Sequence, residues 1–427
     1  MRRRVLIIAY YFPPLGLSGV QRVSKFAKYL PDFDWDVTVL TVHPRSYFAY
    51  DDSLLEELEQ RGIEIERTAS IDPTRLPLRR RIDLPSESGR RRLSMLSQTL
   101  FQPDNKIGWY PFAVKRGREI LREREHHAIF SSAPPYTAHL IGASLSRKAQ
   151  IPLIVDYRDD WLDNPRHEYP SAWHRKLAQK MEDSVFRRAH TTVSINERIR
   201  YRLQKRSRDM MDARRHKVIA HGYDPEDFPE GRSAPERGDR MRIVYTGVFY
   251  DAQKPDVFLR GLARFLRVSP GSRDRISAQF VGLLPKSAAR LVGELDLSDV
   301  VHHSGYVSHA DTVEEMRSAD VLWMTIGRRS GSHGISTGKL YEYFGARKPI
   351  LGLVPEGVAR DSLIDYGASQ IAEPDDPDDV AVALGKLFKQ WEAGLLPEPD
   401  HDFIDRFNRK DLAARLADIL NNATGAT

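Results

Sequence analysis

The amino-acid sequence predicts a two-domain α/β protein in which each domain is built on a doubly wound parallel sheet. Short apolar runs alternate with amphipathic helical patterns along the chain, which is typical of parallel sheets covered by helices. The alternation is interrupted by the polar segment 231–240 and then starts again. A chain of 427 residues is long enough for two domains of ordinary size, each with its own core.

The first apolar run, 5–10, predicts a buried strand, and a glycine-bearing loop, an amphipathic helix and a second strand at 36–41 follow it. These elements form one β-α-β unit. Phe403 to Leu420 predicts a last amphipathic helix. We therefore expect domains at 1–230 and 241–398, followed by a helical segment at 399–427. The remaining strands are predicted at 127–131, 152–156, 191–195, 217–220, 242–247, 278–282, 300–303, 320–325 and 350–353.

The composition indicates a globular protein of the cytoplasm. Hydrophobic residues make up 41% of the chain and charged residues 29%. The apolar run near the N-terminus, 5–11, is far shorter than a membrane span and leads into two prolines instead of a small-residue cleavage site. The sequence has no cysteine, which excludes disulfides and fits a reducing compartment. A net charge of +6 permits attraction to phosphates or anionic lipid, but it does not imply nucleic acid.

The segment 336–350 contains the most informative motif. Ser336, Thr337 and Gly338 open a short apolar helix, and helix N-termini offer unpaired N–H groups and partial positive charge to phosphate. Glu342 lies one turn further on, where a carboxylate can accept hydrogen bonds from the two hydroxyls of a ribose. The motif therefore predicts a nucleotide site. The alternative is a helix with an ordinary apolar core face and a solvated Glu342.

This stretch resembles the donor-site motif of the family-4 retaining glycosyltransferases, which runs from a Glu to a Pro before a strand, here Glu342 to Pro349. The family has another Glu eight positions earlier, where this chain has Gly334. The resemblance implies the GT-B architecture: two Rossmann-like domains face each other across a cleft, and a C-terminal helix returns to the N-terminal domain.

The resemblance also implies a function. A hexosyltransferase of this type moves a sugar, with retention, from a nucleoside-diphosphate-sugar donor to a hydroxyl of a glycan or lipid-linked acceptor. Surface polysaccharide or glycolipid biosynthesis is the expected setting. The donor is a substrate, and no metal or other cofactor is expected. The two Asp-x-Asp sequences, 32–34 and 376–378, lie in turn-like contexts, and no zinc-ligand spacing appears.

Gly16 and Gly19 follow the first strand, at the carboxyl edge of the sheet where ligands bind in this architecture. The spacing Gly-x-x-Gly differs from a dinucleotide fingerprint, and the second strand ends without an acidic residue for a ribose. The loop is similar to the family's N-terminal glycine-rich loop, which approaches the donor phosphates or the acceptor. A plain tight turn is the alternative.

The segment 156–161, Asp-Tyr-Arg-Asp-Asp-Trp, follows another strand at the same edge. Carboxylates clustered beside an arginine form the kind of setting in which acid–base groups occur. The segment resembles a variant in polysaccharide-building members of the family, which suggests that Asp159 or Arg158 contacts the acceptor or the transferred sugar as a catalytic residue. The alternative is that Arg158 forms a salt bridge that fixes the strand end.

Gly247 and Lys254 begin the second domain and resemble the family segment in which an Arg and a Lys neutralise the donor pyrophosphate. Val248 stands at the position of that Arg, so Lys254 is a candidate for the phosphates. Lys339 and Arg328 are the alternatives, since two phosphates need a cationic partner. Tyr306 matches the segment whose backbone meets the nucleotide base.

Arginine triplets at 79–81 and 90–92 lie among large apolar residues between positions 76 and 101. Such a composition suits an anionic bilayer and predicts peripheral docking on the inner membrane face; a solvated loop is the alternative. Two other functions stay open. One is a catalytically inactive nucleotide-sugar-binding partner of a glycan assembly, which Gly334 and Val248 favour, and the other is a nucleotide-sugar epimerase of the same fold.

Overall fold

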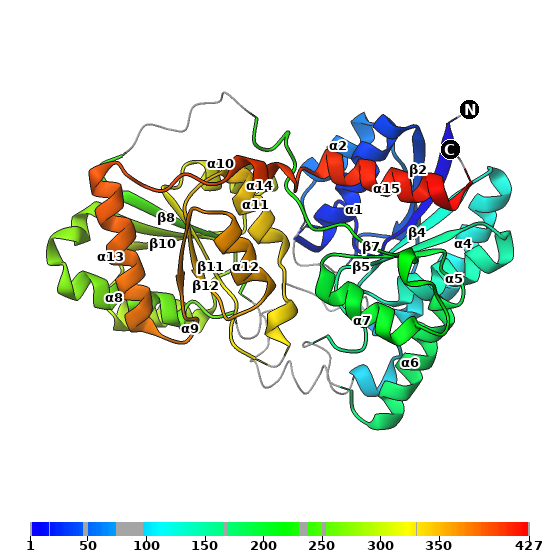
Figure 1. Cartoon of the computed structure of the whole chain (residues 1–427), viewed down its shortest axis with the longest axis horizontal. Coiled ribbons are helices and arrows are strands. Elements are labelled where there is room, and N and C mark those ends of the chain that lie inside the picture. The colour runs from blue at the N-terminus through cyan, green and yellow to red at the C-terminus, as the bar shows by residue number, and fades with distance from the viewer. Residues whose placement is uncertain are drawn as a thin grey trace. The chain divides into compact units, whose positions relative to one another are not determined.

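The computed structural model of the chain divides into two compact units (Figure 1). Unit 1 comprises Met1–Ala220 and Arg409–Thr427, and unit 2 comprises His221–Asn408. Most of the predicted linker 231–240 and of the basic segment 76–101 lies outside the described residues. The residues that the structure describes are 2–16, 18–45, 50–73, 97–164, 169–229, 238–249, 253–329 and 331–425.

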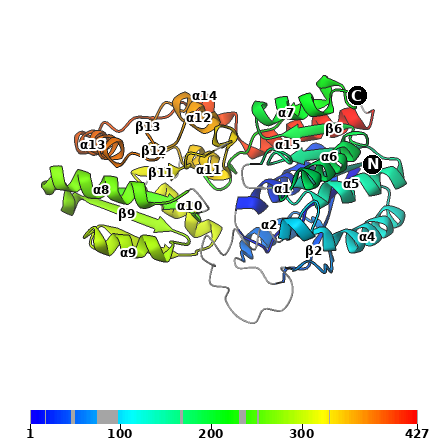
Figure 2. The same cartoon turned by 90° about the horizontal axis from the view of Figure 1, so that it is seen from below.

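Unit 1 contains a parallel sheet of seven strands in the order β3-β2-β1-β4-β5-β6-β7. Helices cover both faces of this sheet (Figure 2). The strands are β1 (Arg3–Ile8), β2 (Trp35–Val42), β3 (Glu64–Thr68), β4 (Ala128–Ala133), β5 (Leu153–Tyr157), β6 (Thr191–Ser194) and β7 (His216–Val218). The helices are α1 (Ser18–Tyr29), α2 (Ser53–Gln60), α4 (Tyr110–Glu123), α5 (Thr137–Ala149), α6 (Ala172–Phe186), α7 (Glu197–Ser207) and α15 (Arg409–Ala423).

Unit 2 contains a parallel sheet of six strands in the order β10-β9-β8-β11-β12-β13. Its strands are β8 (Met241–Thr246), β9 (Ile276–Val281), β10 (Val301–Gly305), β11 (Val321–Thr325), β12 (Ile350–Leu353) and β13 (Ser369–Ala372). Its helices are α8 (Asp256–Val268), α9 (Lys286–Glu294), α10 (His309–Arg317), α11 (Gly338–Ala346), α12 (Val358–Asp365), α13 (Pro377–Ala393) and α14 (His401–Asp405).

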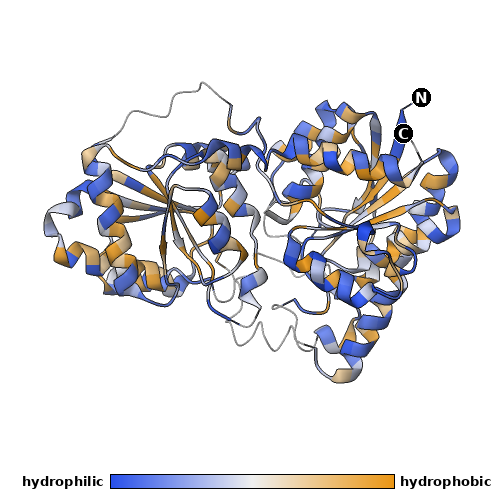
Figure 3. Ribbon diagram, viewed as in Figure 1, coloured by the Kyte–Doolittle hydropathy of each residue, from blue (hydrophilic) through white to orange (hydrophobic). Residues whose placement is uncertain are grey.

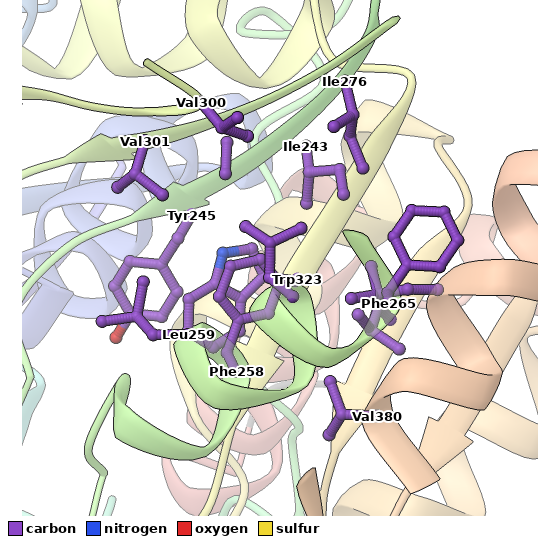
Figure 4. Packing of buried hydrophobic residues seen from close by; sticks show 14 of the residues in the cluster. Ile243, Tyr245, Phe258, Leu259, Phe265, Ile276, Val300, Val301, Trp323 and Val380 are labelled. Carbon is purple, nitrogen blue, oxygen red and sulfur yellow. The ribbon is translucent and has the colours of Figure 1, made fainter. Parts of the chain in front are cut away.

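The central strands are apolar on both faces, as parallel sheets between two helical layers require. In unit 2, α8, α9 and α13 share one buried cluster with the sheet. Trp323 of β11 lies at its centre, stacked on Phe258 of α8 with ring centroids 4.1 Å apart (Figure 4). Tyr245 of β8 packs against the same indole at 4.8 Å. Orange segments along the strands in Figure 3 mark this apolar interior.

In unit 1, α4, α5, α6 and α7 bury their apolar residues on one face of the sheet. α1 and α15 bury theirs on the other. Each unit is therefore a three-layer α/β/α structure. Among the described residues, no helix combines the length and the apolar character that crossing a membrane would need.

Two edge strands, β3 and β13, are absent from the sequence prediction. Most residues of both strands are only partly buried, and β3 reads Glu-Ile-Glu-Arg-Thr. An edge strand pairs on one side alone and needs no continuous apolar run, so its sequence resembles a loop.

The predicted helix from Phe403 to Leu420 is wrong as a single helix. The structure contains α14 in unit 2 and α15 in unit 1, separated by residues 406–408. Phe407 O accepts a hydrogen bond from Tyr223 N–H at 3.0 Å, which holds the backbone between the two helices outside helical hydrogen bonding. Helix α15 packs its apolar face with α1 and β1.

Candidate functional site

The strand order of each sheet reverses once, and this reversal locates the edge where a ligand is expected. In unit 2 the reversal lies between the neighbouring strands β8 and β11. In unit 1 it lies between β1 and β4. Ligands of open parallel sheets bind beyond the carboxyl ends of the strands at such a point. The loops that follow these four strands are therefore the candidate positions for a ligand site.

Three glycines end consecutive strands of unit 2: Gly247, Gly282 and Gly305. Each has a positive φ, of 108°, 128° and 78° respectively, which side chains tolerate poorly. The N–H of Gly247 donates to Val281 O at 2.7 Å, and that of Gly282 donates to Gly305 O at 2.8 Å. A Cβ at Gly282 would lie 2.1 Å from Gly247 O. The strand ends thus present bare, closely packed backbone at this edge.

Helix α11 begins in the segment that follows β11. Thr337 precedes it with extended backbone, and its side chain does not cap the helix. Thr337 Oγ1 is buried and has no hydrogen-bond partner in the described part of the chain. Ser336 Oγ, in contrast, pairs with the Tyr341 hydroxyl at 2.8 Å. The start of α11 therefore offers main-chain N–H groups and one hydroxyl to an anion.

Tyr343 fixes α11 against the sheet. Its hydroxyl accepts a hydrogen bond from Thr246 N–H at 3.0 Å and donates one to Trp323 O at 3.1 Å. Thr246 ends β8, and Trp323 lies in β11, the two strands at the reversal. One fully buried side chain thus sets the position of the helix relative to both strands.

Lys339 lies in the first turn of α11 beside the glycine edge. Its ammonium is 3.5 Å from the centroid of the Tyr245 ring. A Cβ at Gly247 would lie 3.3 Å from Lys339 Nζ, so the ammonium lies next to the loop after β8. Desolvation lowers the pKa of Lys339 to about 7, and the nearby Glu342 carboxylate opposes this fall only in part. An anionic ligand would strongly stabilise the protonated form of such a desolvated ammonium.

Glu342 follows Lys339 by three residues on the same face of α11. The residue is half-buried. A carboxylate can accept two hydroxyl hydrogen bonds at once, and an ammonium with free N–H groups can bind phosphate oxygens. The structure thus brings Ser336, Thr337, Gly338, Lys339 and Glu342 together at one edge with Gly247.

Arg328 forms ion pairs with two carboxylates beyond β13, Glu373 at 2.5 Å and Asp375 at 3.4 Å. Its charge is already balanced, which makes it a weaker candidate than Lys339 for binding phosphate. Lys254 is exposed just before α8, and Tyr306 is half-exposed directly after β10. The donor-binding roles of these three residues stay predictions.

In unit 1, Gly16 is buried after β1, and Gly19 lies in the first turn of α1. The Arg158 guanidinium donates hydrogen bonds to the carbonyl oxygens of Gly19, Pro134 and Ala133. Arg158 is buried and joins the start of α1 to the loop that follows β4. These contacts position backbone around the reversal between β1 and β4. The predicted salt bridge of Arg158 is replaced by carbonyl contacts, and its catalytic role stays a prediction.

A buried ion pair that the sequence prediction missed lies beneath this loop. Arg22 of α1 contacts Asp156 of β5 at 2.8 Å, and both side chains are almost fully buried. Ser132 Oγ donates to the same carboxylate at 2.7 Å. Arg22 also donates to Ala220 O at 2.7 Å. The sequence carries one indication of this pair, since Arg22 occupies a helix position at the apolar spacing of Val23 and Phe26.

Asp160 belongs to a second buried network. Arg206 of α7 contacts Asp160 at 2.7 Å and Glu182 of α6 at 2.9 Å. Burial raises the pKa of Glu182 to about 7, although Arg206 acts in the opposite direction. Asp159 is half-buried, and its charge acts on Tyr136 and Arg158. The network therefore holds the backbone on which Asp159 is presented, while the catalytic role of Asp159 stays a prediction.

Comparison with known families finds a similarity in the N-terminal half of the chain. Residues 19–222 match the family model of the glycosyl transferase 4-like domain. This segment is similar to a glycosyl transferase 4-like domain. It contains Gly19, Arg158 and Asp159. No group of three or more His, Cys, Asp or Glu side chains that could hold a metal ion occurs among the residues described.

A curated relative matches part of the chain. D-inositol 3-phosphate glycosyltransferase from Kineococcus radiotolerans is 29% identical over 166 residues, which are 35% of this chain and 37% of the relative. The chain thus matches less than half of that relative's length.

Solved structures match over nearly the whole chain. A glycosyltransferase from Rickettsia africae has a TM-score of 0.65 at 14% identity, with 99% of this chain and 98% of that chain covered. Anabaena HepE, in complex with UDP and glucose, has a TM-score of 0.67 at 16% identity, with 98% of this chain and 100% of that chain covered. At such identities the likeness shows the fold, and it confirms the predicted two-domain α/β GT-B architecture.

Proposed function

We propose that the protein is a glycosyltransferase that moves a sugar from a nucleoside-diphosphate-sugar donor to a hydroxyl of a glycan or lipid-linked acceptor. The start of α11 carries this proposal, because it gathers N–H groups, the Lys339 ammonium and the Glu342 carboxylate at the carboxyl edge of β8 and β11. The similarity of residues 19–222 to the glycosyl transferase 4-like domain supports a transferase. The complex of Anabaena HepE with UDP and glucose supports a nucleoside-diphosphate sugar as donor.

In this proposal the donor pyrophosphate binds the N–H groups at the start of α11 and the Lys339 ammonium. Glu342 accepts the ribose hydroxyls, and the backbone beside Tyr306 meets the base. Asp159 contacts the acceptor or the transferred sugar, and transfer proceeds with retention in surface polysaccharide or glycolipid biosynthesis. Each role follows from the chemistry of the group: amides and ammonium for phosphate, carboxylate for hydroxyls.

The experiment that tests the proposal measures release of nucleoside diphosphate from a panel of nucleotide sugars, with and without a membrane-derived glycan acceptor. We expect release to increase when acceptor is added. Asp159→Asn should depress turnover while nucleoside-diphosphate affinity is kept. Release that is unaffected by acceptor for every donor would contradict a transferase.

An inactive nucleotide-sugar-binding partner is the second candidate. Gly334 lies between β11 and α11, and the whole segment 326–341 contains no Asp or Glu. A donor-facing carboxylate from this loop, which the resemblance leads one to expect, is therefore missing. Nucleoside-diphosphate binding without any turnover would favour this candidate over the transferase.

Replacing Glu342 with alanine is expected to weaken nucleoside-diphosphate binding by about 1.5–3 kcal/mol, the range for hydrogen bonds to charged groups. Isothermal titration calorimetry with the preferred nucleotide measures this loss. Glu294→Ala at the exposed end of α9 is a matched control and should leave the affinity unchanged. Equal affinities for Glu342→Ala and wild type would remove Glu342 from the site.

Binding of a nucleoside diphosphate is expected to draw a proton into the protein at about pH 8. Lys339 has a pKa of about 7 and is mostly neutral there, and pyrophosphate beside it would raise that pKa. Affinity should therefore fall as pH rises above about 7. Calorimetry in two buffers of different ionisation enthalpy gives the proton uptake directly. Lys339→Met should abolish the uptake and exposed Lys389→Met should keep it; uptake that survives Lys339→Met would assign the proton to another group.

A further inference from the structure

Helices α6 and α7 lie side by side in unit 1 and carry an unusual concentration of positive charge (Figures 1 and 2). Residues 171–217 contain 14 Lys and Arg and 5 Asp and Glu, a net charge of +9, whereas the whole chain has +6. The rest of the chain is therefore slightly acidic. Hydrophilic colour predominates along α7 (Figure 3). A general excess of Lys and Arg over the chain therefore does not explain the positive charge of residues 171–217.

The inner faces of the two helices account for only part of this charge. Asp160 and Glu182 neutralise the charge of Arg206, and Arg175 pairs with Asp163 at 2.9 Å. The outer faces retain exposed basic residues at one-turn to two-turn spacing: Lys176 and Lys180 on α6, and Arg198 and Lys205 on α7. Because such residues share a helix face, each helix presents a cationic stripe to solvent.

One aromatic side chain stands in each stripe. Trp173 at the start of α6 and Tyr201 of α7 are each 64% exposed. Large exposed aromatic rings are uncommon on a soluble surface, and Trp and Tyr prefer the boundary between water and lipid, where the ring meets the acyl region and its polar group stays hydrated. Cations beside them match the phosphates of anionic lipids.

We propose that the outer faces of α6 and α7 dock on an anionic membrane surface. The occupant is a bilayer and not a groove-bound polymer, because the cations lie in stripes on two neighbouring convex helices, each with one ring placed to enter the headgroup layer. The four cations and two aromatic rings of this surface are described residues that lie outside the segment 76–101 in the sequence. Docking does not depend on the proposed transferase activity, so it is measured without donor.

Vesicle co-sedimentation tests the cationic stripes. The variant K176Q/K180Q/R198Q/K205Q is compared with K115Q/R118Q/R122Q/K148Q, which removes the same charge from exposed positions on α4 and α5. Each basic residue near an anionic surface contributes about fivefold in partitioning. We expect the first variant to lose at least about a hundredfold in binding to vesicles that contain phosphatidylglycerol. The control should lose less than about threefold, and both should show wild-type circular dichroism and thermal unfolding.

Tryptophan fluorescence reports on the surface directly. The other five tryptophans are at most 2% exposed, so Trp173 dominates quenching by iodide. Phosphatidylglycerol vesicles should shift the emission to shorter wavelength and protect it from iodide, whereas phosphatidylcholine vesicles should do neither. Trp173→Phe should lose this change but still co-sediment.

Three outcomes would overturn the proposal. They are no binding of wild type to anionic vesicles, equal losses for the α6–α7 variant and its control, and a Trp173 response to a soluble polyanion such as heparin without any response to vesicles.

Discussion

Arg206→Ala is expected to lower the free energy of unfolding by about 3–5 kcal/mol, because it leaves the buried Glu182 without its cation and Asp160 with only the longer ion pair to Arg202, at 3.4 Å. Asp160 and Glu182 have side chains that are 4% and 1% exposed, and Arg206 contacts them at 2.7 and 2.9 Å. The loss should be greater at pH 8 than at pH 6. Glu182 already has a pKa raised to about 7, and without Arg206 it is tolerated best when protonated. Urea denaturation followed by tryptophan fluorescence measures both effects.

The matched control is Arg200→Ala on the same helix. Arg200 pairs with Glu197 at 2.5 Å, but that carboxylate is largely exposed. Surface pairs of this kind contribute up to about 1 kcal/mol. Similar losses for the two variants would mean that solvent reaches Asp160 and Glu182 and that the network is not a buried one.

Gly282→Ala is expected to destabilise unit 2 by more than about 3 kcal/mol. A side chain at φ 128° is strained by itself, which costs about 1–3 kcal/mol. In addition, its Cβ would lie 2.1 Å from Gly247 O, so the backbone after β8 would have to move. The displaced backbone lies beside Lys339, and nucleoside-diphosphate affinity should fall with stability. Thermal unfolding with and without nucleotide measures both.

Gly385→Ala in α13 is the control for this substitution. Its Cβ would meet Phe265 at 3.7 Å, an ordinary contact, and the helix favours alanine over glycine by about 0.5–1 kcal/mol. We therefore expect a change of the opposite sign, with affinity unchanged. A Gly282→Ala variant as stable as wild type would show that the loop after β8 can relax at little cost.

The fold was largely predictable, because central strands such as β1 and β11 contain continuous apolar runs of four residues, which buried parallel strands typically show. The edge strands β3 and β13 were not, since half-solvated strands need no such run. The division between α14 and α15 was missed for another reason. Phe403 and Ala417 would share one face of a continuous helix but pack in different units, and periodicity does not reveal which core a residue joins.

Those parts of the site that consist of neighbouring residues could be predicted from the sequence. Those that depend on ion pairs between distant residues could not. The start of α11 and the glycines at strand ends could be found, because a turn or helix start is written in neighbouring residues. The bonds of Arg22 to Asp156 and of Arg206 to Asp160 join residues 134 and 46 positions apart. The sequence does not show which oppositely charged residue an Arg or Asp will contact. The two networks that hold the Asp159 loop were therefore found only in the structure.

Unit 1 is assembled from two separated stretches of chain, and this sets an order on its folding during synthesis. The apolar residues of α1 and β1 share their core with Leu412, Leu416 and Leu420 of α15, which emerge from the ribosome after all of unit 2. Unit 2, as one continuous stretch from His221 to Asn408, can complete its core while the first face of unit 1 is still uncovered. The core of unit 1, which is synthesised first, is therefore completed last. Until α15 is synthesised, the uncovered apolar face of α1 and β1 is the surface that chaperones would recognise.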